Sequence, residues 1–222
     1  MFIKKLIFVL FLILFYQTHL YSKSINFEKI DSKNLSKYFS GIVASQNKDN
    51  SKALDFFNSS KILINTHDAY LKRIVSSLVL ENKISQAINV IKQNKDKKNS
   101  NFFNANLLII IDSLKKNNLD KAYTYLNKAA QSRSLNNFDL AILESLKQYI
   151  YVFKEKKIPN TKENLGKLST ISETFQRCYL DDQNTDLYFS NLLNDDDGDY
   201  TRYIFFYLSY LIENTRLDEA KK

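Results

Sequence analysis

Few residues of this sequence have the types and spacing that catalysis needs. His67 stands beside Asp68 in the stretch INTHDAY, and a carboxylate can orient a histidine that acts as a general base. No activated nucleophile is paired with them in the sequence, so we expect His67 to lie in a turn or to cap a helix. Cys178 is the single cysteine, and its apolar helical surroundings favour a buried free thiol over an intermolecular disulfide.

The stretch NDDDGDY, residues 194–200, is similar to a calcium-binding loop. With Gly198 as the turn glycine, however, the closing acidic ligand would fall on Ile204, so the pattern fails. We expect an acidic connector instead, with Asp199 near the start of the next helix. Residues 23–222 contain one His and one Cys, too few for a zinc site. The sequence therefore predicts no catalytic residue, no metal and no cofactor.

The composition indicates long helices. The chain has 222 residues, of which 44% are hydrophobic, and only three Gly and one Pro to form tight turns. A sheet protein needs turn residues at many short intervals, so this usage favours an all-α fold. The formal net charge is +8, but the lysines lie mostly in predicted turns such as residues 92–98, so we expect no nucleic-acid partner.

The N-terminus has the layout of a secretory signal peptide. Lys4 and Lys5 precede an unbroken apolar run from Leu6 to Tyr16, which is shorter than the ~20 residues that span a bilayer. We expect residues 1–22 to be removed and residues 23–222 to be periplasmic. The alternative is an uncleaved segment in which residues 6–16 anchor the chain to the inner membrane; membrane contact is expected only in that case.

One phrase recurs along the chain: a polar turn followed by a helical stretch with an Ala near its start. Ala53, Ala87 and Ala122 carry it at intervals of 34 and 35 residues, and Ala220 follows 98 residues later. Each unit therefore reads as two antiparallel helices. Helix axes at ~8–10 Å leave no room for a long side chain at the crossing, so we expect Leu at Ala122 to be costly. Leu at Asn118, in the turn, should be tolerated.

The repeats weaken after the third unit. Residues 136–159 predict one strong helix, and residues 161–193 predict one or two degenerate pairs. The last unit is expected to be incomplete, leaving Tyr207 and Leu211 partly exposed beside a missing second helix. A non-repeating helical bundle with accidental Ala spacing is the alternative.

The pattern resembles the tetratricopeptide repeat, whose period is about 34 residues and which carries an Ala followed by an aromatic. Ala53 and Phe57 match that pair, and Gly41 matches the small residue of the family's first helix. The other units depart from the pattern at Val75, Ile91, Ile110 and Leu126. The resemblance implies antiparallel helix pairs stacked as an α-solenoid, and it is best over residues 34–131.

In tetratricopeptide proteins the first helix of each unit lines a concave groove that holds peptide segments. The resemblance places the groove residues fifteen and eleven positions before each repeat Ala, at Tyr38, Ile42, Lys72, Ser76, Leu107 and Ile111. The first unit lacks the Lys and Asn of the family's carboxylate clamp, so the groove is expected to be mixed, with Lys72 at one edge. Ordinary packing between repeats is the alternative role for each of the six.

We therefore expect an exported, non-catalytic tetratricopeptide-type scaffold that binds a protein or peptide in the bacterial cell envelope. Two alternatives come from other classes. The chain could be the N-terminal fragment of a longer envelope protein whose missing part carries the function. It could also be an envelope enzyme with a dispersed carboxylate site, which would bring two acidic side chains together in one pocket.

Overall fold

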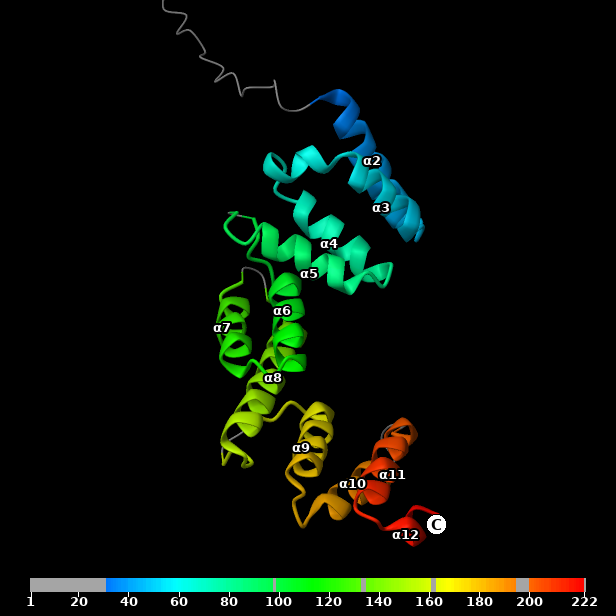
Figure 1. Ribbon diagram of the computed structural model, residues 1–222, viewed down its shortest axis with the longest axis vertical. Coiled ribbons are helices and arrows are strands. Elements are labelled where there is room, and N and C mark those ends of the chain that lie inside the picture. The colour runs from blue at the N-terminus through cyan, green and yellow to red at the C-terminus, as the bar shows by residue number, and fades with distance from the viewer. Residues whose placement is uncertain (1–30, 98, 133–134, 161–162, 195–199, 222) are drawn as a thin grey trace, which may run out of the picture. The chain divides into compact units, whose positions relative to one another are not determined.

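The fold is all-helical in the part of the chain that is described. This computed structural model describes residues 31–97, 99–132, 135–160, 163–194 and 200–221 (Figure 1). Neighbouring helices pack against one another and no strand occurs in these ranges, which confirms the predicted all-α class. None of the helices in these ranges is long and apolar enough to cross a membrane. The predicted signal peptide lies outside the described residues.

The chain divides into two compact units, residues up to Ser77 and residues from Leu78 on. Unit 1 contains α2 (Ser32–Gln46), α3 (Asn50–Ser59), the 3-10 helix η2 (Lys61–Asn65) and most of α4 (Tyr70–Leu80), which runs on into unit 2. Helices α2 and α3 pack antiparallel as a hairpin (Figure 1). An Asp caps the start of each, since Asp31 accepts the backbone N–H of Lys33 and Asp49 that of Lys52, both at 3.1 Å.

Unit 2 contains the remaining helices. In chain order they are α5 (Ile84–Gln93), α6 (Phe103–Lys115), α7 (Leu119–Ala130), α8 (Asn137–Glu155), α9 (Lys167–Leu180), α10 (Thr185–Leu193), the 3-10 helix η3 (Thr201–Tyr203), α11 (Ile204–Glu213) and α12 (Leu217–Ala220). The best-packed neighbours in chain order are α6 with α7, α7 with α8, and α9 with α10. One core cluster joins α6, α7 and α8. It contains Ile110 from α6, Ala122 and Leu126 from α7, and Leu143 and Ile150 from α8.

The recurring phrase of the sequence corresponds to one recurring turn. The middle residue of each turn has a positive φ, which is 62° at Lys48, 56° at Asn82, 53° at Asn117 and 60° at Thr215. The next residue donates its backbone N–H to the carbonyl five positions earlier: Asp49 to Ala44, Lys83 to Leu78, Asn118 to Ser113 and Arg216 to Leu211. This is the Schellman closure of a helix, here made without Gly. Each middle residue precedes its repeat Ala by five positions, so turn and Ala recur together.

A fifth turn of this kind was missed by the sequence analysis. Asp181 has a φ of 52°, and the N–H of Asp182 donates to the carbonyl of Arg177 at 3.0 Å. Asp186 lies five positions beyond Asp181, at the position where the other four turns are followed by Ala. Asp181 and Thr215 are 34 residues apart, so the last two turns keep the period. Residues 161–193 thus supply one helix pair, α9 and α10, in the described ranges.

The small residues of the recurring sequence pattern are closely packed. Ala53, Ala87 and Ala122 are each 0% exposed. Gly41 of α2 lies against Phe57 of α3: a Cβ at Gly41 would lie 2.8 Å from Cε1 of that ring. The expectation for Asn118 was wrong, because its side chain caps α7 by accepting the backbone N–H of Lys121 at 3.1 Å. A cap of this kind contributes about 0.5–2 kcal/mol, so replacing Asn118 has a cost of its own.

Leu in place of Ala122 should overpack the cluster between α6, α7 and α8. We expect Ala122→Leu to lower the free energy of unfolding by about 1–3 kcal/mol, because a fully buried site cannot take three more carbons without displacing its neighbours. Asn127→Leu is the matched control, since Asn127 is exposed on the same helix. Urea denaturation followed by circular dichroism measures both. Equal stability of the two variants would contradict the assignment of Ala122.

Helix α9 carries a buried amide, that of Gln176. Ser145 of α8 and Ser172 of α9 are hydrogen-bonded at 3.0 Å, and Gln176 follows one turn along α9. Gln176 is 0% exposed, and neither its Oε1 nor its Nε2 has a hydrogen-bond partner among the described residues. An unsatisfied buried polar group costs about 1–3 kcal/mol.

Removing that amide should stabilise the protein. We expect Gln176→Leu to raise the free energy of unfolding by about 1–3 kcal/mol, since the leucine carries no polar atom that must be desolvated. Gln148→Leu is the control, because the Gln148 amide donates to Glu144 at 3.3 Å and its loss should give no gain. A Gln176→Leu protein with a lower melting temperature than the wild type would contradict this prediction.

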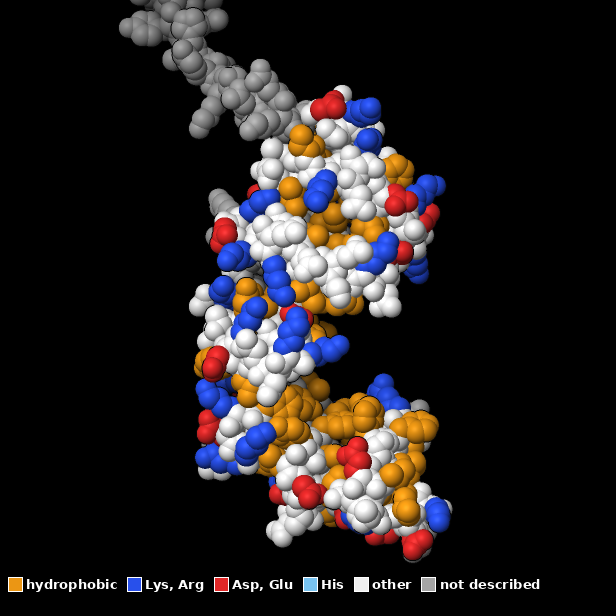
Figure 2. Space-filling view, in the orientation of Figure 1, with side chains coloured by type: hydrophobic (Ala, Val, Ile, Leu, Met, Phe, Trp, Pro, Cys, Tyr) orange, Lys and Arg blue, Asp and Glu red, His pale blue; other side chains and the backbone are white. Residues whose placement is uncertain are grey.

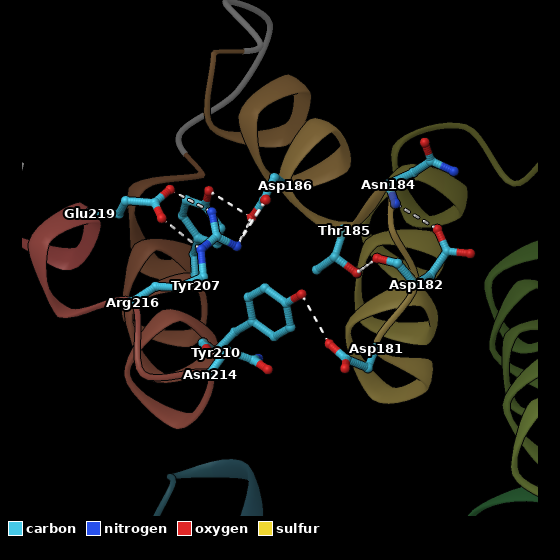
Figure 3. A network of polar contacts seen from close by, with 10 residues as sticks. All are labelled: Asp181, Asp182, Asn184, Thr185, Asp186, Tyr207, Tyr210, Asn214, Arg216 and Glu219. Atoms are coloured by element: carbon cyan, nitrogen blue, oxygen red, sulfur yellow. Dashed lines mark hydrogen bonds and ion pairs between the residues drawn. The ribbon is translucent and has the colours of Figure 1, made fainter.

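The hairpin of α11 and α12 differs from the expectation that Tyr207 and Leu211 are partly exposed. Leu211 is only 2% exposed, and Tyr207 is half-buried, with its ring stacked on Phe189 of α10 at 4.8 Å. The hydroxyl of Tyr207 donates to Asp186 at 3.1 Å, and Arg216 contacts both oxygens of the same carboxylate at 2.9 and 3.0 Å (Figure 3). The expected exposure of Leu211 is therefore wrong, because α11 turns this face inward and towards α10.

The exposed apolar residues of α11 lie on another face. Phe205 is 72% exposed, and Phe206 and Ile212 are each 53% exposed. Figure 2 shows apolar side chains gathered over the part of unit 2 that holds α8, α9 and α11. Because α11 is apolar on several faces, burying one of them leaves others in contact with solvent.

Candidate functional site

A hollow in unit 1 contains two of the residues that the tetratricopeptide resemblance places in a groove. It has a volume of about 420 Å³ and lies between the end of α2, α3 and the start of α4. Its lining consists of Ser45, Phe57, Ala69, Lys72, Arg73, Ser76 and Ser77. Lys72 and Ser76, which are one helical turn apart on α4, both line this hollow.

Tyr38 lies beneath this surface and does not line it. The residue is 2% exposed, and its ring contacts the rings of His67 at 4.5 Å and Phe57 at 5.8 Å between centroids. Its hydroxyl accepts a hydrogen bond from Nε of Arg73 at 3.1 Å. Tyr38 is thus unavailable for direct contact with a partner, but it holds the guanidinium of Arg73 in place.

The other three predicted groove residues lie outside the hollow. Ile42 is half-buried in unit 1 and is not part of the lining of the hollow. Leu107 and Ile111 belong to unit 2, where Leu107 is half-buried and Ile111 is 44% exposed. Partner binding and packing between repeats both remain predictions for these three residues.

The hollow combines positive charge with hydroxyl groups. Lys72 and Arg73 are both exposed, and no acidic side chain is among the seven lining residues. Three serines add hydroxyls, of which that of Ser77 is on a nearly buried residue, 3% exposed. Ammonium, guanidinium and hydroxyl groups all donate hydrogen bonds, and the bonds from cations to carboxylates are the strongest of these. The arrangement suits a carboxylate.

Phe57 forms the aromatic floor of the hollow and packs against the ring of Tyr70. Phe57 is 1% exposed and Tyr70 is fully buried, with ring centroids 6.4 Å apart in an edge-to-face contact. The hydroxyl of Tyr70 donates to the backbone carbonyl of Phe57. Burial raises the pKa of Tyr70 above its usual value, so the hydroxyl stays protonated and keeps donating. This packing fixes the start of α4, and with it Lys72 and Arg73.

The remaining candidates for chemistry do not gather into a site. His67 lies between η2 and α4, and its backbone carbonyl accepts the N–H of Tyr70 at 3.0 Å, which fits the expected turn role. Cys178 is half-buried rather than buried, and desolvation raises the pKa of its thiol, with Glu213 and Asp181 adding to the shift. Within the described ranges no group of three His, Cys, Asp or Glu could hold a metal ion. Residues 195–199 lie outside those ranges.

The acidic residues of the α9–α10 turn are engaged in structure. Burial alone would raise the pKa of Asp182, but the backbone N–H of Asn184 and the guanidinium of Arg177 outweigh it, and the pKa lies below its usual value. Asp181 accepts a hydrogen bond from the hydroxyl of Tyr210 at 3.1 Å (Figure 3). These carboxylates therefore tie helices together.

Comparison with known proteins adds no assignment. No family model, curated protein or solved structure matches this chain.

The sequence analysis missed Arg73, Ser45 and Ser77 as parts of the hollow. Arg73 follows Lys72 directly, and the doubled charge on an otherwise mixed helix was a usable signal. Ser45 had no such signal, because its place depends on how α2 ends beside α4.

Proposed function

We propose that this chain is an exported bacterial protein of the tetratricopeptide type, an α-solenoid that binds a protein or peptide partner in the cell envelope and catalyses no reaction. In such a solenoid the repeats would stack to share a core, since one helix pair cannot bury its apolar face alone. The five turns with the same closure, four of them followed by an Ala, support the repeat assignment. The layout of residues 4–24 supports export.

The observation that carries the binding function is the hollow of unit 1. It combines Lys72, Arg73 and three hydroxyl groups with an aromatic floor and without an acidic lining residue. We propose that it receives an acidic segment of the partner, whose carboxylate bonds to Lys72 and Arg73. That carboxylate belongs either to an Asp or Glu side chain of the partner or to the partner's C-terminus.

Fluorescence anisotropy with labelled peptides tests this proposal. We expect an acidic peptide to bind the chain and a basic peptide of equal length not to bind. Lys72→Glu should weaken the acidic peptide about tenfold or more, because losing a charge-assisted bond and adding repulsion exceeds 1.4 kcal/mol. Lys61→Glu, an exposed change in the same unit outside the hollow, should leave affinity unchanged.

Two further comparisons make the result specific. An acidic peptide with an amidated C-terminus keeps its affinity if side chains are bound and loses it if the terminal carboxylate is bound. Equal effects of Lys72→Glu and Lys61→Glu would mean that only net charge matters, and would rule out the hollow as the binding site.

A further inference from the structure

The two cationic side chains that line the hollow of unit 1 are held differently. Nε of Arg73 donates a hydrogen bond of 3.1 Å to the hydroxyl of Tyr38, which joins α4 to α2. Lys72 is exposed, and it forms no hydrogen bond or ion pair with another of the described residues. Although the two residues are adjacent in the sequence, only Arg73 is therefore tied to a second helix of the described chain.

The ring of Tyr38 is packed among other rings. The residue is 2% exposed, and its ring contacts those of Phe57, His67 and Tyr70 at 5.8, 4.5 and 6.0 Å between centroids. Close packing of this kind restricts a side chain to few rotamers, because most others would collide with a neighbour. The hydroxyl of Tyr38 is thereby kept within reach of Arg73.

A bond at Nε leaves the other edge of the guanidinium for a ligand. The group is planar and carries N–H donors on Nε and on both terminal nitrogens. Among the described residues, no acidic side chain pairs with Arg73, and its terminal nitrogens have no hydrogen-bond partner. The edge between these two nitrogens can donate two parallel hydrogen bonds to the two oxygens of one carboxylate.

We propose that Tyr38 is a positioning residue for carboxylate binding: it holds Arg73 so that the two terminal nitrogens, and not Nε, receive the partner's carboxylate as a bidentate pair. Lys72 attracts the same carboxylate as a point charge on a flexible stem and gives the bond little direction. This inference rests on the proposed function, because it concerns how the hollow holds an acidic ligand. It adds that affinity depends on the orientation of Arg73 and not on its charge alone.

The bond between Tyr38 and Arg73 can be tested without a ligand. In nitrogen-15 NMR spectra of the free chain, we expect the Nε–H signal of Arg73, assigned by its loss in Arg73→Lys, to be protected from exchange with water. Hydrogen-bonded protons in packed regions exchange slowly. Tyr38→Phe keeps the ring and removes the acceptor, so it should abolish this protection. Equal exchange rates in the two proteins would overturn the proposal.

The labelled acidic peptide then measures the effect on binding. Tyr38→Phe should weaken the peptide about fivefold, because a guanidinium that is not already held must be immobilised on binding. Arg73→Lys should weaken it about tenfold although the charge is kept, since an ammonium cannot form the paired bonds. Tyr207→Phe is the control: it also removes a hydroxyl that is hydrogen-bonded, to Asp186 at 3.1 Å, but in unit 2, and it should leave affinity unchanged.

A double-mutant cycle separates positioning from a general structural role of the hydroxyl. Arg73→Met keeps the aliphatic stem and removes the guanidinium. In that background Tyr38→Phe should cause no further loss of affinity, since no guanidinium is left to orient. Equal losses in both backgrounds would overturn the proposal, as would wild-type affinity of either Tyr38→Phe or Arg73→Lys, and in these cases the proposed function still stands. If the acidic peptide does not bind the wild type at all, the proposed function fails and this inference fails with it.

Discussion

A Phe57→Ala variant is expected to lose about 3–5 kcal/mol of unfolding free energy. The Phe57 side chain is 1% exposed and contacts the rings of Tyr38 and Tyr70, so its removal leaves a cavity in the middle of unit 1. Phe39→Ala is the matched control. Phe39 lies on α2 of the same unit and is 56% exposed, and its loss should cost about 1 kcal/mol or less. Urea denaturation followed by circular dichroism gives both values.

The contact between Gly41 and Phe57 sharpens this prediction. Alone, Gly41→Ala should destabilise the protein, because the added Cβ would lie 2.8 Å from the Phe57 ring. In the Phe57→Ala background the same change should cost less, because the ring is gone, only Cβ of Phe56 remains close at 3.2 Å, and Ala is favoured over Gly in a helix by about 1 kcal/mol. The two changes are then coupled. Additive effects would show that α2 and α3 do not cross at these residues.

A Leu211→Ala variant should lose about 2–5 kcal/mol, because Leu211 is 2% exposed in the α11–α12 hairpin. The neighbouring residue provides the control: Ile212 is 53% exposed, and Ile212→Ala should change stability by no more than about 0.5 kcal/mol. Hydrogen exchange of residues 200–221, read by mass spectrometry, locates the loss. If the two variants were equally stable, the hairpin would not be packed as described.

Local rules predicted much of the fold. The scarcity of Gly and Pro indicated helices, and the Ala spacing located the turns before Ala53, Ala87, Ala122 and Ala220. Those turns are specified by a few adjacent residues, so a pattern in the sequence is enough to find them. The turn at Asp181 was missed because Asp186 stands where the pattern expects Ala. Its carboxylate serves a distant residue, Arg216, and no local rule reports that contact.

Burial depended on contacts that the sequence does not show. The tetratricopeptide resemblance places Tyr38 in a groove, yet the rings of Phe57, His67 and Tyr70 cover it. Leu211 was expected to be exposed because the next helix is short, but α11 turns that face inward. One helical turn separates Lys72 and Ser76, so both line one hollow, whereas Ser45 reaches the same hollow from another helix.

Site-specific photo-crosslinking in envelope extract tests most directly the claim that the hollow of unit 1 binds a partner. Benzoylphenylalanine is placed at Ser76, which lines the hollow, or at Asn58, an exposed residue of α3 outside it. If the hollow binds the partner, we expect a discrete adduct at position 76 that Lys72→Glu abolishes and an acidic peptide competes away, and no such adduct at position 58. An adduct of the same mass and yield at both positions, unaffected by Lys72→Glu, would contradict it.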